Sequence, residues 1–194
     1  MKNTIVKDAL ILFLITAVAG VLLAFVNELT KEPIARQKAE AINEACRAVF
    51  PDADEFVLKE ELKDSSEWSG KYPKDLIDAV YEAKKNGALG GYVINVCNKE
   101  GYGGAIRFSM GVSADGTLCG VSILETSETP GLGLNAQEVL VPQFKGRTAE
   151  SFVYVKGGAS ADNEIDAISS ATITTRAFVN GVNAGLDYFR MYLR

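Results

Sequence analysis

The sequence contains no histidine, and several other residue types are scarce. Its 194 residues include only three cysteines, five prolines and one tryptophan. Without histidine the chain has no Ser-His-Asp triad, no Cys-His dyad, no histidine-ligated zinc and no side chain that ordinarily titrates near neutral pH. Any chemistry must therefore come from carboxylates, hydroxyls, thiols or a bound cofactor.

Cysteine usage predicts no metal site. Cys46, Cys97 and Cys119 are widely separated and no C-x-x-C pair occurs, whereas zinc and iron–sulfur clusters need closer or more numerous thiolates. We interpret all three as small buried hydrophobic side chains. A disulfide between Cys97 and Cys119 stays open for an oxidising compartment, because spacing alone does not determine pairing.

Acidic residues outnumber basic ones by 25 to 20, which gives a formal charge of -5. This balance argues against a nucleic-acid partner, because such binding is driven by the neutralisation of phosphates. Apolar residues make up 47% of the chain and charged residues 23%, which is typical of a folded protein. The length suits one domain of ordinary size.

One long apolar run occupies residues 9–26, where 18 consecutive residues carry no charge. A helix needs about 20 such residues to cross the roughly 30 Å hydrocarbon core of a membrane. A cleaved signal peptide is one alternative, since Ala17-Val18-Ala19 has the A-x-A form, but the apolar run continues through that site. A buried core helix would ordinarily carry a polar stripe. We therefore predict an uncleaved single-pass anchor.

Charge at the start of the chain predicts the topology. Lys2, Lys7 and the free amino group precede the apolar run, so the positive-inside rule favours a cytoplasmic N-terminus. Residues 1–27 would then form the cytoplasmic end and the cell-membrane anchor, and residues 28–194 an extracytoplasmic domain. That domain carries 18 basic and 24 acidic residues, so charge would not hold it on anionic lipid head groups.

The rest of the chain is predicted to be an α+β domain, an antiparallel sheet with flanking helices. Helical spacing at residues 34–49, with Pro33 in the first turn, predicts a helix that follows the anchor after a short break and ends at Pro51. Residues 52–75 are charged and irregular, with a short strand at residues 56–58. Apolar alternation predicts further strands at residues 79–83, 91–97, 106–112 and 117–124. The strict alternation at residues 106–112 indicates a half-buried strand.

Two segments suit a ligand, although each also has a plain structural interpretation. At residues 125–133, Pro130, Gly131 and Gly133 form either an ordinary turn before a helix near Asn135 or a backbone that closely approaches a flat ligand. At residues 166–175, several hydroxyls precede the last predicted helix. One interpretation is that these hydroxyls cap the N-terminus of the helix. The other is that the N–H groups of the first turn stay free and hold an anion such as phosphate.

These segments, taken in order, resemble the FMN-binding domain family. Asp166 and the run Ser169-Ser170-Ala171-Thr172 are similar to the flavinylation motif D-x-x-[ST]-G-A-T. Residues 128–133 match the E-T-P-G-L-G loop of the family, and residues 101–104 match its glycine loop. With the anchor, the resemblance covers essentially the whole chain. Within this family the chain resembles the G subunit of Rnf electron-transport complexes, and the C subunit of the sodium-pumping NADH:quinone oxidoreductase is a close relative.

The resemblance implies a covalent flavin and a role in electron transfer. A separate flavin transferase would attach FMN from FAD to the Thr172 hydroxyl as a phosphoester, with a magnesium ion. The chain would then act with other membrane and peripheral subunits in an ion-translocating ferredoxin:NAD oxidoreductase, and would not be catalytic alone. Thr174 and Thr175 are disfavoured as acceptors. The resemblance places these residues around the cofactor: Glu128, Thr129, Gly131, Leu132, Gly133, Ser169, Ser170 and Ala171, with Asp166 as a motif residue.

Two positions depart from the family pattern. Ser170 stands where the motif has glycine, which costs of order 1 kcal/mol if that position needs a positive φ. Thr126 lies near a position that is commonly histidine. Other functions stay open: a C-type subunit of a sodium-translocating NADH:quinone oxidoreductase, a flavin-free tethered interaction domain, or an FMN-binding regulatory domain.

Overall fold

The computed structural model describes residues 2–59, 68–73 and 76–194. Within it the chain divides into two compact units, Met1–Ala41 and Ile42–Arg194. The first unit is helical, and the second contains the sheet and all the shorter helices. Part of the irregular segment predicted at residues 52–75 lies outside the described residues.

Helix α1 (Lys2–Val49) is continuous, so the predicted break before residue 34 is wrong. Pro33 lies inside this helix, where its ring removes one N–H donor but its fixed φ near −65° still suits helical backbone. The residues around it, among them Leu29, Ala35 and Arg36, are good helix formers that carry the helix through this point. The predicted end before Pro51 is confirmed.

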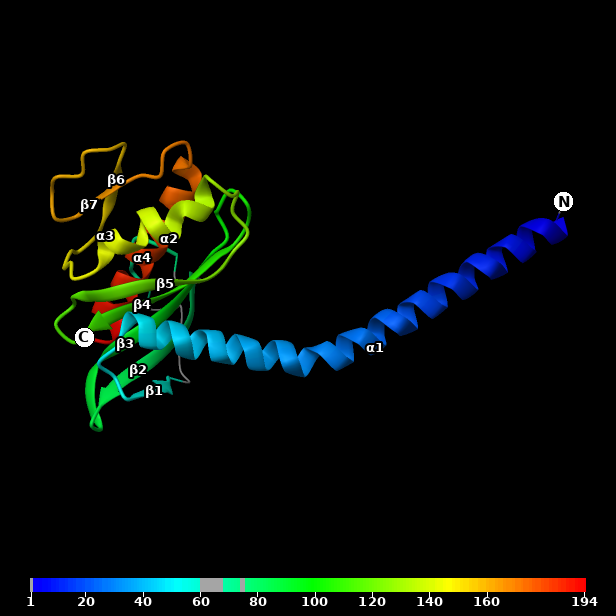
Figure 1. Ribbon diagram of the computed structural model, residues 1–194, viewed down its shortest axis with the longest axis horizontal. Coiled ribbons are helices and arrows are strands. Elements are labelled where there is room, and N and C mark those ends of the chain that lie inside the picture. Colours follow the sequence, from blue (N-terminus) through cyan, green and yellow to red (C-terminus); the bar gives the residue numbers. More distant parts are fainter. Residues whose placement is uncertain (1, 60–67, 74–75) are drawn as a thin grey trace. The chain divides into compact units, whose positions relative to one another are not determined.

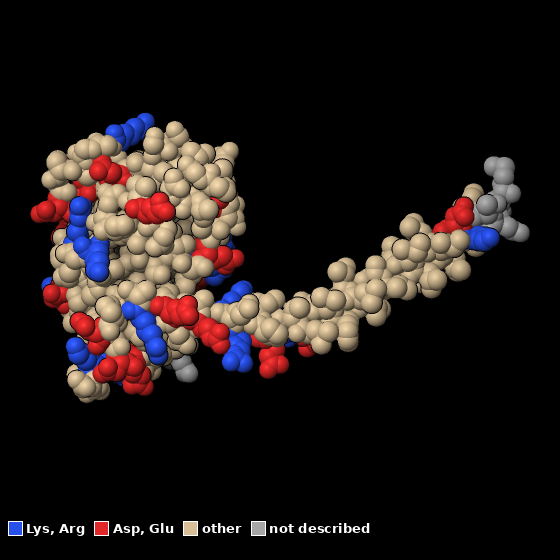
Figure 2. Space-filling view, in the orientation of Figure 1, with Lys and Arg blue, Asp and Glu red and all other residues tan. Residues whose placement is uncertain are grey.

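The apolar part of α1 exposes its side chains on all sides. Residues 9–26 are exposed, and Figure 2 shows this stretch without Lys, Arg, Asp or Glu. Among the described residues, α1 is the helix that is long and apolar enough to cross a membrane, judged by length and composition. A water-soluble protein would ordinarily bury such a set of apolar side chains in its interior.

A five-stranded antiparallel sheet forms the centre of the second unit (Figure 1), and its strands lie in chain order. They are β1 (Glu55–Leu58), β2 (Ile77–Lys85), β3 (Ala88–Asn98), β4 (Ile106–Ser113) and β5 (Leu118–Thr126). The turn at Asn86-Gly87 joins β2 to β3, and residues 114–117 join β4 to β5. The predicted α+β class and each of the predicted strands are confirmed.

One face of the sheet is covered by helix α4 (Thr172–Tyr192). The rings of Phe108 in β4 and Phe178 in α4 stack with their centroids 4.5 Å apart. A Cβ at Gly181 would lie 2.9 Å from the Phe108 ring, so the glycine lets the helix backbone approach the sheet closely. The main core lies in this layer, where it joins side chains of both elements.

The other face of the sheet is covered by the last turns of α1. Cys46, Val49 and Phe50 form a second buried cluster with Ala83 and Val93 of the sheet. This layer corrects the prediction of a half-buried strand at residues 106–112, because β4 is buried on both faces along most of its length. A Cβ at Gly111 would lie 2.6 Å from the Val49 carbonyl oxygen. Gly111 therefore makes room for α1, and Ser109 on the same strand is also buried.

Short elements complete the domain between β5 and α4. A 3-10 helix η3 (Gly133–Asn135) leads into helices α2 (Ala136–Val139) and α3 (Val141–Phe144), as the predicted helix near Asn135 anticipated. Strands β6 (Val153–Val155) and β7 (Glu164–Asp166) pair in parallel. These two strands were not predicted, because three residues are too few to show an alternation.

Burial of Cys46 makes the stability of the domain sensitive to alkaline pH. Burial raises the pKa of this thiol from 9.0 to about 11, because the thiolate would lose its hydration. Between these values the unfolded chain releases a proton that the folded chain keeps, so the free energy of unfolding falls as pH rises. The fall is at most about 1.4 kcal/mol for each pKa unit of difference.

We expect Cys46→Ala to flatten this decline between pH 9 and 11 in urea unfolding of the full chain in detergent. Cys97 and Cys119, whose pKa values burial also raises, should preserve part of the slope. Because alanine leaves a small cavity, the slopes are compared and not the absolute stabilities. An unchanged slope would contradict the prediction.

Candidate functional site

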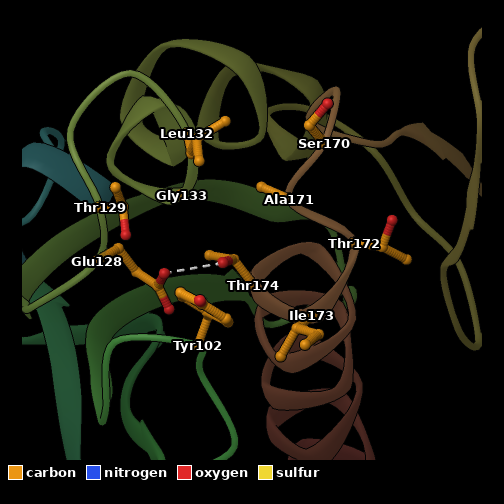
Figure 3. Close-up of a pocket in the computed structure, with 10 residues that line it drawn as sticks. All are labelled: Tyr102, Glu128, Thr129, Leu132, Gly133, Ser170, Ala171, Thr172, Ile173 and Thr174. Atoms are coloured by element: carbon orange, nitrogen blue, oxygen red, sulfur yellow. Dashed lines mark hydrogen bonds between the residues drawn. The ribbon is translucent and has the colours of Figure 1, made fainter.

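A cavity of about 460 Å³ lies where two loops of the sheet meet the start of α4 (Figure 3). One loop follows β3 and the other follows β5. The volume of the cavity is within the range of small-molecule and cofactor sites. Small and apolar side chains dominate its wall, and Glu128 is the one carboxylate. The lining residues are Tyr102, Glu128, Thr129, Leu132, Gly133, Ser170, Ala171, Thr172, Ile173 and Thr174.

The first turn of α4 has no side-chain cap. The residue before it, Ala171, offers no side-chain acceptor, and the first N–H of the helix with a backbone acceptor is that of Thr175, bonded to the Ala171 carbonyl at 3.0 Å. Among the described residues, no acceptor meets the N–H groups of residues 172–174. The alternative that the hydroxyls at residues 169–175 cap this helix is therefore not what the structure shows. These N–H groups and the positive end of the helix dipole suit an anion.

The three threonines of this turn differ in accessibility. Thr172 is exposed, whereas Thr174 and Thr175 are 1% and 0% exposed. The Thr174 hydroxyl donates to Glu128 Oε2 at 2.9 Å. The Thr175 hydroxyl donates to the Ala171 carbonyl at 2.9 Å and accepts from the Ile168 N–H at 3.1 Å. Only the Thr172 hydroxyl of the three is open to a reagent from solvent.

Ser170 adopts a left-handed backbone conformation with φ of 62°. Of the described non-glycine residues, Asn86 in the β2–β3 turn is the only other one with a positive φ, and asparagine tolerates this region better than serine. The position that the family motif fills with glycine thus requires a positive φ in this chain. Serine there carries a strain of about 1 kcal/mol.

Glu128 is buried in the pocket wall, with 6% of its surface exposed. Its Oε2 accepts the hydrogen bond from Thr174, and its Oε1 has no hydrogen-bond partner among the described residues. Figure 3 shows the Glu128 and Thr174 side chains pointing toward each other below Gly133. A Cβ at Gly133 would lie 2.7 Å from Thr174 Oγ1, so the loop backbone closes tightly over this pair.

The structure brings most, but not all, of the predicted site residues together. Glu128, Thr129, Leu132, Gly133, Ser170, Ala171 and Thr172 line the cavity. Gly131, Ser169 and Asp166 do not. The cavity is also lined by three residues that were not predicted to lie there: Tyr102, Ile173 and Thr174. Tyr102 lies inside the glycine loop at residues 101–104, which was the available signal, whereas the other two depend on the rotation of α4.

Asp166, the motif residue, lies outside the lining of the cavity. It ends β7, and its Oδ1 accepts a 2.9 Å hydrogen bond from the Ala159 N–H. Its own N–H donates to Gln143 Oε1 at 2.7 Å, and its carbonyl accepts from Gln143 Nε2 at 3.1 Å. Asp166 thus ties the β6–β7 loop and helix α3 to the segment that leads into α4.

Ser170→Gly should stabilise the domain by about 1 kcal/mol, because glycine adopts the positive φ without strain. That gain raises Tm by about 2–4 °C in a domain of this size. Ser169→Gly is the matched control: Ser169 is also exposed but its φ is not positive, so glycine there should lower stability by about 0.5 kcal/mol. Thermal unfolding of both variants tests this, and effects of the same sign would contradict it.

Two family models match parts of this chain. A family model described as the FMN-binding domain matches residues 101–187, and one described as the RnfG N-terminal region matches residues 1–49. The crystal structure of Shewanella oneidensis NqrC aligns with a TM-score of 0.56 and 18% identity, over 80% of this chain and 95% of that one. At this identity the likeness shows the fold alone.

Two relatives match along most of their length. The G subunit of the Na(+)-translocating ferredoxin:NAD(+) oxidoreductase complex of Acetobacterium woodii is 37% identical over 193 residues, 97% of this chain and 93% of that protein. The G subunit of the proton-translocating ferredoxin:NAD(+) oxidoreductase complex of Clostridium ljungdahlii is 31% identical over 171 residues, 88% of this chain and 83% of that protein. The resemblance seen in the motifs is confirmed, and the chain belongs to the family of G subunits of ion-translocating ferredoxin:NAD(+) oxidoreductase complexes.

Proposed function

We propose that this chain is a membrane-anchored electron-transfer subunit of an Rnf-type complex and carries FMN bound covalently through Thr172. The observation that carries the proposal is the exposed Thr172 hydroxyl at the uncapped first turn of α4. A phosphate on this hydroxyl would lie at the free N–H groups of residues 172–174, where a helix stabilises an anion.

The pocket residues fit the remainder of the cofactor. Gly133 lets the loop backbone approach closely, and Leu132, Tyr102 and Ile173 offer apolar surface that is 38%, 70% and 43% exposed without a ligand. Such side chains suit a flat aromatic ring system, which buries apolar area on binding. FMN supplies one-electron and two-electron transfer when bound, so the absence of histidine removes nothing that the reaction needs.

Maturation requires access to the acceptor oxygen. In the proposed reaction the Thr172 oxygen bonds to the FMN phosphorus of FAD, AMP leaves and the hydroxyl proton is released, with a magnesium ion in a separate flavin transferase. Ser169 and Ser170 are exposed and small, so no bulky side chain adjoins the hydroxyl on its N-terminal side. Buried hydroxyls at Thr174 and Thr175 disfavour attachment there.

We also propose a topology for the membrane anchor. The apolar run of α1 would cross the cell membrane once, with residues 1–27 as the cytoplasmic end and anchor and residues 28–194 outside. Other membrane and peripheral subunits of the complex would then exchange electrons with a flavin at the outer face. A covalent bond has a clear advantage there, because a dissociated flavin would be lost to the medium.

Thr172→Val should abolish covalent flavin when the full chain is co-expressed with a flavin transferase, because valine has no acceptor oxygen. In-gel fluorescence under ultraviolet light after denaturing electrophoresis measures this. Thr172→Ser is the matched control, since it keeps a hydroxyl and should retain the fluorescent band. A band that persists in the valine variant would overturn Thr172 as acceptor, and a colourless wild-type chain would favour a flavin-free interaction domain.

The proposed topology predicts the behaviour of reporters fused after Arg194. Alkaline phosphatase should be active at this junction, because it folds on the outer side of the cell membrane. Green fluorescent protein should be dark there, because it folds on the cytoplasmic side. The paired reporters control for expression level. A fluorescent fusion to green fluorescent protein together with an inactive phosphatase fusion would contradict the proposed topology.

A further inference from the structure

Arg176 is an exposed cation one helical turn after Thr172, and its charge has no partner. It is the fifth residue of α4, and it is exposed to solvent. In the described part of the chain, its guanidinium forms no ion pair and no hydrogen bond. Arginine keeps its charge at every pH at which proteins are folded. The start of α4 therefore carries a permanent positive charge that no described acid pairs with.

Thr172 and Arg176 lie on the same face of α4. Residues four apart on a helix are neighbours, with about 5–6 Å between their Cβ atoms. The burial pattern agrees, because Thr172, Ile173 and Arg176 are exposed whereas residues 174–175 and 177–179 are buried. Long side chains on a helix also lean toward its N-terminus. A group attached to the Thr172 oxygen therefore lies within reach of the Arg176 guanidinium.

The first turn of α4 has an unusual distribution of charge. Helices ordinarily carry acidic residues in the first turn and basic residues in the last, which complements the helix dipole. The first turn of α4 contains no acid, and its N–H groups at residues 172–174 meet no acceptor among the described residues. Arg176 adds a full positive charge beside this positive end. The arrangement is unfavourable for the bare helix, and an anion bound at Thr172 would remove the conflict.

We propose that Arg176 binds the phosphate group of the flavin attached to Thr172. A phosphate in this linkage carries a single negative charge and has two free oxygens. These oxygens can accept hydrogen bonds from the planar guanidinium as well as from the N–H groups of the helix. This inference rests on the proposed function, because it concerns the phosphate on the same threonine. It adds that a side chain outside the lining of the cavity holds the phosphate end of the cofactor.

The inference predicts that flavin attachment reverses the effect of Arg176 on stability. Without flavin, the guanidinium only adds to the positive end of α4, so Arg176→Gln should leave Tm unchanged or raise it by up to about 1 °C. With flavin, the same substitution removes the ion pair with the phosphate and should lower Tm by about 1–3 °C. Arg176→Lys keeps the charge but loses the planar guanidinium, so its flavinylated form should have an intermediate Tm.

The test is thermal unfolding of the full chain in detergent, prepared with and without a co-expressed flavin transferase. Intact mass gives the flavin occupancy of each sample, and variants are compared at equal occupancy. Each sample is measured at about 0.05 M and about 1 M NaCl, because salt screens an exposed ion pair. The Tm loss of flavinylated Arg176→Gln should shrink by at least half at the higher salt concentration.

Lys145→Gln is the matched control, since it removes the same charge from another exposed residue. Lys145 follows α3, next to Gly146, whose N–H donates to the Leu118 carbonyl at the start of β5. Glu128 and the cavity follow the other end of that strand. We therefore expect Lys145→Gln to change Tm equally with and without flavin.

The outcomes separate this inference from the proposed function. An equal Tm change in flavinylated and unflavinylated Arg176→Gln would overturn the role of Arg176 and leave the covalent flavin intact. A flavin-dependent loss of the same size in Lys145→Gln would reduce the effect to net charge and would overturn that role as well. A wild-type chain that gains no flavin mass would instead overturn the proposed function, and this inference with it.

Discussion

Helix α4 lies directly on the sheet, and the position of the site follows from this packing. Gly181 lets the helix backbone approach Phe108, and the Phe108 and Phe178 rings stack at 4.5 Å. The Asn98 side chain, at the end of β3, donates a 2.8 Å hydrogen bond to the Ala177 carbonyl. These contacts fix the height and rotation of α4, so its first turn stands beside the loops that follow β3 and β5. A displaced helix would separate the Thr172 hydroxyl from the pocket.

The polar groups of the site come from the backbone at the start of α4 and from one buried acid, Glu128. The free N–H groups at the start of α4 supply a positive end that suits an anion, and Glu128 supplies a buried carboxyl group. Thr174 joins the two, since it belongs to the first turn of the helix and donates to the acid. Such a helix start suits an anion without histidine. What limits its chemistry is then the bound group, which matches a chain that has few acid–base side chains.

Sequence patterns predicted the parts of the fold that repeat along the chain. Strands β2 to β5 follow from alternation, and α4 follows from its apolar spacing and hydroxyl-rich start. The sequence pattern predicted that Gly111 and Ser109 face solvent. In the structure both are buried, and Gly111 lies against Val49 of α1, so β4 is buried on both faces. Similarly, motif identity found Glu128 and Thr172, but Thr174 and Ile173 enter the pocket through the rotation of a helix. Asp166 was predicted only as a motif residue, and its hydrogen bonds connect the β6–β7 loop and helix α3.

Two local conflicts with ordinary folding rules occur at the site. Ser170 holds a left-handed backbone that serine disfavours, and Glu128 keeps an oxygen without a donor. Each destabilises the domain on its own, and the packed sheet with its two covering helices supplies the stability that tolerates them. Residues of this kind gather where function constrains the chain more than folding does. Ser170 shapes the turn that presents Thr172, and Glu128 lies in the wall of the same cavity, so both conflicts occur in one pocket.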